Sequence, residues 1–85
     1  MKIVFSPDAL EDYQYFKQSA PKLAEKTRQL IENIISTPYV GLGKPEPLKY
    51  GLTGYWSRRI NHEHRLVYKV TENTVFIVSC RYHYK

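Results

Sequence analysis

Apolar positions recur at helical spacing in two stretches of the first half of this 85-residue chain. A Ser-Pro-Asp triplet at residues 6–8 is typical of a helix start, because it offers a capping side chain, a fixed first φ and an acid in the first turn. The positions that follow predict a helix over about residues 7–18. A second helix is expected from Pro21 and should end before Pro38. With a short strand at residues 2–5, the first half is expected to form a strand and a helical hairpin.

The second half changes to the alternating spacing of strands. Residues 38–54 come first and carry four Gly and three Pro, too many for a regular element. A loop this long in a small domain is usually functional or disordered. Three strands are then expected, at residues 55–60, 65–70 and 74–84. The sequence therefore predicts an α+β fold in one domain over residues 1–85, with the helical hairpin packed on one face of a small, twisted, mainly antiparallel sheet.

Turns at residues 61–64 and 71–73 would pair these three strands. The expected pairs are Trp56 with Tyr68 and Arg59 with Arg65 in the first hairpin, and Val70 with Thr74, Tyr68 with Phe76, Leu66 with Val78 and Arg65 with Ser79 in the second. Because side chains alternate across a strand, this register sorts the strand residues into two faces. A slip of one residue would reverse the faces of a whole strand.

One of the two faces is apolar and should form a core with the helices. It consists of Trp56, Ile60, Leu66, Tyr68, Val70, Phe76, Val78, Cys80 and Tyr82. The other, which we call the basic face, consists of Tyr55, Ser57, Arg59, Arg65, Lys69, Ser79, Arg81 and His83. Arg58 falls on the apolar face and is expected at a sheet edge. Val67, Val75 and Ile77 fall on the basic face, where we expect a partner to cover them.

Charge and aromatic content indicate the kind of partner. The formal net charge is +5, which favours nucleic acid, an anionic surface or an acidic protein. Eight Tyr and one Trp favour RNA, whose unpaired bases stack on aromatic rings. A basic domain with aromatic core residues is equally consistent with this composition. A single cysteine and the lack of any long apolar run predict a soluble, cytoplasmic protein.

The basic face is suited to a phosphate with a proton donor beside it. Arginine binds phosphate oxygens through a rigid fork of donors, and His83 could give or take a proton near neutrality. Glu46 is a candidate carboxylate base if the loop that carries it folds over this face. Taken singly, the arginines could be solvated or paired with Glu63, and Glu46 could be an ordinary surface acid.

No metal site is expected from the sequence. His62 and His64 lie in one turn with Glu63 between them, and two histidines from a single turn do not complete a ligand set. Simple solvation of this turn is the better interpretation. No other cofactor is predicted.

Four blocks of the sequence resemble the Txe/YoeB family of bacterial toxins, which lies in the RelE-like superfamily. They are GKPEPLK at 43–49, GYWSRRI at 54–60, EHRLVY at 63–68 and CRYHY at 80–84. The number and order of the blocks make the resemblance specific, and it extends over the whole chain. It implies a RelE-like fold and the toxin of a type II toxin-antitoxin system. Such a toxin is a ribosome-dependent endoribonuclease that cuts mRNA in the A site and is silenced by an antitoxin.

The resemblance also implies a role for individual residues. Glu46 would be the general base, Arg65 the cation that stabilises the phosphate, and His83 the general acid. Tyr84 would orient the substrate or the acid. The residues that would support binding or site geometry are Lys49, Arg59, Glu63 and Arg81. The implied partners are an acidic antitoxin, the ribosome and mRNA, with no membrane, while a homodimer stays open.

Two other functions remain open from the sequence. A RelE-fold toxin could inhibit by binding alone, as ParE-like relatives do with DNA gyrase, but it would not need Glu46, Arg65 and His83 together. A non-catalytic RNA-binding module could use the same basic face. Among the three, only a nuclease would leave discrete cuts within the codons of a translated message.

Overall fold

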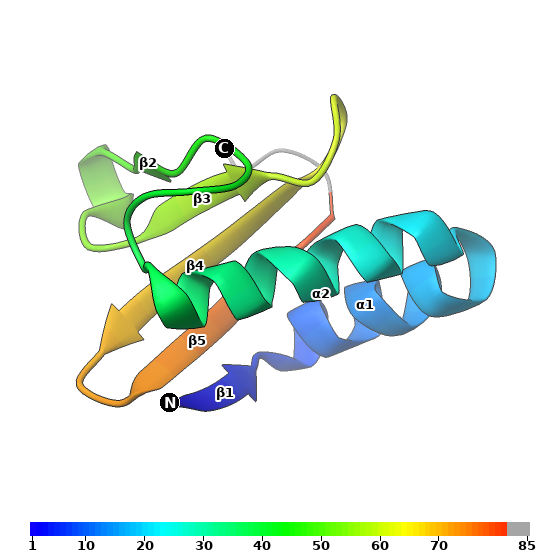
Figure 1. The fold of residues 1–85 in the computed structure, drawn as a ribbon, viewed down its shortest axis with the longest axis horizontal. Helices are drawn as coiled ribbons and strands as arrows, with labels where there is room; N and C mark the ends of the chain where they lie inside the picture. The colour runs from blue at the N-terminus through cyan, green and yellow to red at the C-terminus, as the bar shows by residue number, and fades with distance from the viewer. Residues whose placement is uncertain (82–85) are drawn as a thin grey trace.

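A computed structural model describes residues 1–81 and shows a helical hairpin packed against a five-stranded sheet (Figure 1). The elements in chain order are β1 (Lys2–Phe5), α1 (Pro7–Ser19), α2 (Pro21–Ser36), β2 (Glu46–Pro47), a 3₁₀ turn (Tyr50–Leu52), β3 (Trp56–Arg59), β4 (Arg65–Thr71) and β5 (Thr74–Ser79). The strand order is β1-β5-β4-β3-β2. Only β1 and β5 are parallel among these neighbours. The predicted α+β fold is confirmed.

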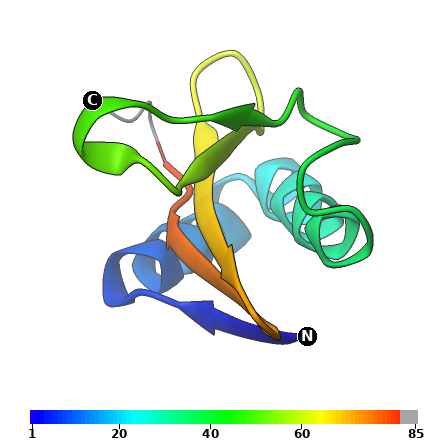
Figure 2. The same cartoon turned by 90° about the vertical axis from the view of Figure 1, so that its left-hand side faces the viewer.

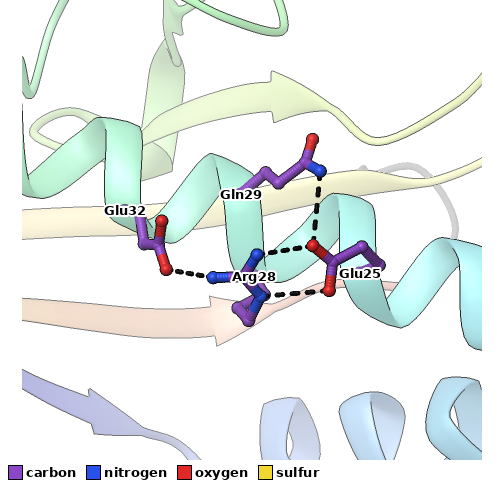
Figure 3. A network of polar contacts seen from close by, with 4 residues as sticks. All are labelled: Glu25, Arg28, Gln29 and Glu32. Carbon is purple, nitrogen blue, oxygen red and sulfur yellow. Dashed lines mark hydrogen bonds and ion pairs between the residues drawn. The ribbon is translucent and has the colours of Figure 1, made fainter.

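Both helices begin where the sequence predicts. Ser6 caps α1, since its Oγ accepts a hydrogen bond from the Ala9 N–H at 3.0 Å. On the outer surface of α2, Arg28 forms ion pairs with Glu25 and Glu32 (Figure 3). The hydrogen bond from Arg28 lowers the pKa of Glu25. Exposed pairs of this kind stabilise a helix only slightly, so α2 is held mainly by its buried side.

The core lies between the hairpin and one face of the sheet. Its buried members are Ala9, Phe16, Ala24, Leu30, Ile31, Ile34, Ile60, Leu66, Tyr68, Val75, Ile77 and Cys80. In Figure 2, where the helices are seen nearly end on, the strand direction turns strongly from β1 to β3, as expected for a small twisted sheet. The opposite face of the sheet is not covered by a helix within residues 1–81, and we call it the helix-free face.

The register predicted for β4 and β5 is wrong by one residue. Thr74 pairs with Thr71 and not with Val70, so the hairpin closes through a two-residue loop. Glu72 in this loop adopts the left-handed conformation, with φ 45°. The sequence TEN can close a hairpin through either two or three residues, and the pattern alone does not choose between them.

The shifted register reverses the faces of β5, because side chains alternate along a strand. Val75 and Ile77 are buried in the core, so they are not part of a patch for a partner. Phe76 is 39% exposed on the helix-free face instead of lying in the core, and Val78 follows it on that face. Of the expected patch, only Val67 faces away from the helices, where it is already buried.

A bulge restores the predicted faces at the end of β5. The register shifts between Val67 and Tyr68, so that Val67 pairs with Ser79. Ser79 therefore faces away from the helices, and Cys80 is fully buried in the core, as expected. Strand β5 ends at Ser79, earlier than the predicted end at residue 84. Residues 82–84 of that prediction, Tyr82 included, lie outside the described residues.

Arg58 is buried and does not lie at an exposed sheet edge, because β2 pairs with the outer side of its strand, β3. Its guanidinium donates to Tyr68 Oη at 3.1 Å, to Asn33 Oδ1, and to the carbonyl oxygens of Thr37 at 2.6 Å, Val40 at 3.1 Å and Leu42 at 3.1 Å. These acceptors compensate for the loss of water around the charge. Arg58 thus fastens β3 to the end of α2 and to the start of the following loop.

Candidate active site

Strand β2 places Glu46 on the helix-free face. Glu46 pairs with Ser57 in an antiparallel ladder, and residues paired in this way point to the same side of the sheet. The segment is held along β3 by the Arg59 N–H, which donates to the Gly43 carbonyl at 2.7 Å. The Gly- and Pro-rich loop therefore does fold against the sheet, and its central Glu46 remains exposed.

Gly43 allows this close approach. Its φ is +79°, a conformation that L side chains rarely adopt. A Cβ at this position would lie 3.0 Å from the Arg59 carbonyl oxygen and 2.9 Å from Cδ2 of Leu30. The glycine is thus required to bring the segment that carries Glu46 against β3.

Two arginines lie beside each other on the same face. Arg59 and Arg65 are paired across β3 and β4, as the sequence predicts. Nη1 of Arg65 donates to carbonyl oxygens of the connecting turn, those of Asn61 at 2.7 Å and His64 at 3.1 Å. All the hydrogen bonds of this guanidinium to described residues involve Nη1, so Nε and Nη2 form a donor edge that no residue of 1–81 occupies. Such an edge matches two oxygens of a phosphate.

The backbone positions of Glu46 and Arg65 are separated by about the width of a substrate group. Glu46, Ser57 and Val67 form a row across three strands, and Arg65 is two residues from Val67 along β4. With strands about 4.8 Å apart and about 3.3 Å per residue, the Cα atoms of Glu46 and Arg65 are about 12 Å apart. A gap of this size between the two backbone positions is wide enough for one phosphodiester, and the Arg65 guanidinium borders it from the side of the 61–64 turn.

The segment after Glu46 forms a hollow in which Lys49 lies. Residues 46–52 line this hollow, whose volume is about 640 Å³. Lys49 is exposed there, and Tyr50 is 91% exposed with φ 60°. An aromatic ring held so far into solvent could stack on a base. Tyr50 was not predicted as a site residue, although an aromatic residue inside a Gly- and Pro-rich loop is a signal that could have singled it out.

Glu63 contacts the neighbouring histidine. Its Oε1 lies 3.5 Å from Nε2 of His64, and no ion pair joins it to Arg59 or Arg65 within residues 1–81. His64 is buried against Phe16, with ring centroids 5.1 Å apart, which is the environment of a packing residue. In the part of the chain that the structure describes, no three His, Cys, Asp or Glu side chains gather as metal ligands would.

Arg81 was predicted to lie on the basic face, and this prediction is wrong. Its guanidinium stacks on the ring of Tyr15 in α1, 3.7 Å from the centroid. The alternation of β5 ends at Ser79, so it does not extend to Arg81. His83 and Tyr84 lie outside the described residues. The structure therefore brings together Glu46, Arg59 and Arg65, and leaves the placement of the expected general acid a prediction.

A family profile described as the YoeB-like toxin of bacterial type II toxin-antitoxin systems matches residues 5–84. This chain belongs to the YoeB-like toxin family. Toxin YoeB of Escherichia coli strain K12 is 48% identical over 84 residues, which cover 99% of this chain and 100% of that protein. Toxin YoeB of Synechocystis is 51% identical over 85 residues, with 100% and 99% covered.

Solved structures of family members have the same fold. A YoeB/ParE toxin from Agrobacterium tumefaciens is 44% identical and superposes with a TM-score of 0.96, covering 99% of this chain and 100% of that one. The YoeB dimer from Staphylococcus aureus is 54% identical, with a TM-score of 0.94 and coverage of 99% and 98%. The same coverage holds for a heterotetrameric YoeB-YefM toxin-antitoxin complex from that organism, whose TM-score is 0.92. Among the described residues, neither helix could cross a membrane.

Proposed function

We propose that this YoeB-like toxin is a ribosome-dependent endoribonuclease that acts in the cytoplasm, where it cuts mRNA in the ribosomal A site and stops translation. The observation that carries the proposal is the gathering of Glu46, Arg59 and Arg65 on one face of the sheet. Within residues 1–81, no carboxylate neutralises either arginine, so both charges are available to a polyanion. Family membership supports the same function.

RNA supplies its own nucleophile, so the protein needs only to move protons and stabilise charge. Glu46 would remove the proton from a 2′-hydroxyl, which then attacks the adjacent phosphorus in line. The Nε and Nη2 edge of Arg65 would bind two phosphoryl oxygens and offset the charge that develops on them. His83 would protonate the departing 5′-oxygen, with Tyr84 beside it, at positions outside the described residues.

The reaction balances without a metal ion or any other co-reactant. One P–O bond forms and one breaks, while the proton taken by Glu46 is matched by the proton given by His83. The products are a 2′,3′-cyclic phosphate and a free 5′-hydroxyl. We also propose binding roles, in which Lys49 and Arg59 contact the RNA backbone and Glu63 supports the turn that holds Arg65.

An antitoxin is the proposed protein partner. Close relatives from Staphylococcus aureus are described both as a YoeB dimer and as a YoeB-YefM complex. The net charge of +5 favours an acidic antitoxin, which would block RNA by covering the basic residues of the helix-free face. A second copy of this chain is a further partner proposed from the same relatives.

Primer extension on a message translated by purified ribosomes tests this function. We expect the wild-type protein to leave discrete cuts within codons, and Glu46→Ala, Arg65→Ala and His83→Ala each to slow cleavage by about 10²-fold or more while the fold persists. Glu11→Ala and Lys22→Ala are matched controls, because they remove an exposed acid and an exposed base from the helices.

The same experiment separates the rival functions. If the wild-type protein arrests growth when expressed in cells but leaves no cuts in the translated message, the nuclease is contradicted and inhibition by binding, of gyrase or of RNA, is favoured. Folded variants that cut at the wild-type rate would leave the nuclease standing and overturn the roles given to their residues. Circular dichroism and thermal unfolding would establish that each variant is folded.

A further inference from the structure

The end of β5 is attached to α1 by residues that are three apart along the helix. Ser6 donates from its Oγ to the Val78 carbonyl at 2.7 Å. The carbonyl of Ala9 accepts from Sγ of Cys80 at 3.5 Å. Asp12 accepts from the Cys80 N–H through Oδ2 at 3.3 Å, and the Tyr15 ring stacks on Arg81 at 3.7 Å. We call Ser6, Ala9, Asp12 and Tyr15 the α1 ridge.

The order of these contacts indicates that they set the path of the chain after β5. Residues three apart on a helix form a continuous row on its surface, inclined to the helix axis. Along the α1 ridge, Ser6 meets Val78, Ala9 and Asp12 both meet Cys80, and Tyr15 meets Arg81, so the contacts follow the order of the chain. The α1 ridge thus contacts the chain from the end of β5 to Arg81, the last described residue. Both views show the end of β5 running beside α1 (Figures 1 and 2).

We infer that Asp12 and Tyr15 are positioning residues for RNA cleavage, acting through the segment that follows Arg81. This inference rests on the proposed function, in which His83 is the general acid. His83 is two residues beyond Arg81, and two residues of chain reach at most about 7 Å. Fixing Arg81 on Tyr15 therefore limits where the acid can be delivered. Arg81 itself takes a positioning role in place of the substrate contact expected from the sequence.

Tyr15 is the step of the α1 ridge best suited to experiment. Its ring is 44% exposed, so replacing it leaves no large cavity in the core. Tyr15→Phe keeps a ring on which the guanidinium can stack, whereas Tyr15→Leu keeps an apolar side chain but no ring. The pair thus separates the stacking interaction from simple occupancy of the site.

The test is the single-turnover rate of cleavage with saturating ribosome-bound message. We expect Tyr15→Leu to cut about 10- to 100-fold more slowly, because a misplaced catalytic group loses rate of this order. Tyr15→Phe should retain the wild-type rate. In a His83→Ala background, Tyr15→Leu should have no further effect, since there is no acid left to position. An equal loss in both backgrounds would overturn the inference.

A matched pair of charge variants controls for the weaker attraction of a less basic protein to RNA. Lys17 lies over the ring of Tyr13 on the same helix, 5.7 Å from its centroid. Lys17→Gln and Arg81→Gln each remove one cation from a tyrosine ring of α1. We expect Arg81→Gln to cut at least 10-fold more slowly and Lys17→Gln to be unaffected. Equal losses would assign the effect to charge and contradict a positioning role.

Amide hydrogen exchange provides a readout that does not depend on cleavage. The Cys80 N–H donates to Asp12, next to the stacked Arg81. We expect this amide to exchange at least several-fold faster in Tyr15→Leu than in the wild type or Tyr15→Phe. Unchanged exchange would overturn the α1 ridge as a device that holds this segment. If the wild type cuts no RNA, the proposed function fails, and the exchange result still decides whether the ridge holds the chain.

Discussion

Burial keeps the Cys80 thiol protonated. Its side chain is inaccessible to water, and this burial, with the Asp12 carboxylate nearby, raises the pKa of the thiol to about 12. In an unfolded chain, a cysteine has a pKa of about 8.5. Between these values the unfolded state has lost the proton that the folded state retains, so a rise in pH favours unfolding. At neutral pH the thiol is therefore inert, and the cysteine anchors the strand end.

The raised pKa of Cys80 predicts how the free energy of unfolding depends on pH. We expect the free energy of unfolding of the wild type to fall as pH rises from about 9 towards 12, by up to about 1.4 kcal/mol per pH unit from this thiol. Cys80→Ala should be less stable at pH 7 but lose less stability over the same interval. Urea unfolding at pH 7, 9 and 10.5 measures both slopes. Parallel slopes for the two proteins would contradict the raised pKa.

At the scale of the elements, local sequence signals were enough to predict the bounds of the helices but not the register of every strand pair. The Ser-Pro-Asp start of α1 and the prolines that flank α2 specify where a helix begins or must end, so both helices were predicted almost to the residue. The β3–β4 register was also correct. The β4–β5 register depended on a turn with two allowed loop lengths and on a later bulge, neither of which has a local sequence signature.

Arg58 shows what a strand pattern cannot reveal. Three of its acceptors are carbonyl oxygens of the loop after α2, and a backbone carbonyl carries no residue-specific signal. Arg58, a cation on an apolar face, was therefore assigned to a sheet edge, whereas the folded chain surrounds it with hydrogen-bond acceptors. The same contacts connect the core to the loop that leads to Glu46.

For β3 we predict that replacing Arg58 lowers the free energy of unfolding much more than replacing its neighbour Arg59. Arg58→Met should lower the free energy of unfolding by about 3 kcal/mol, because buried acceptors would lose their donors. Arg59→Met is the matched control on the same strand, and its exposed side chain should change stability by about 0.5 kcal/mol or less. Urea unfolding of both variants measures the difference. Equal stabilities would contradict a structural role for Arg58.

For the whole molecule, the sequence predicted the part of the candidate site that lies on β3 and β4, because the register of these two strands was predicted correctly. The proximity of Arg59 and Arg65 follows from the predicted β3–β4 register across one short turn. The β2 pairing that adds Glu46 to their face was not predicted, because its loop was expected to contain no regular element. Arg81 could not be placed, because its position depends on a stack with a helix residue 66 positions earlier in the chain. Alternation along a strand contains no information about such a contact.

The central claim is that RNA is cut by its own 2′-hydroxyl on the helix-free face of this toxin. The most direct measurement uses ribosomes programmed with a message that carries one 2′-deoxynucleotide at the position where the unmodified message is cut. We predict that the wild-type protein cuts the unmodified message, leaving a 2′,3′-cyclic phosphate and a 5′-hydroxyl, and that it fails to cut at the deoxy position. Cleavage at the deoxy position at an undiminished rate would contradict this account.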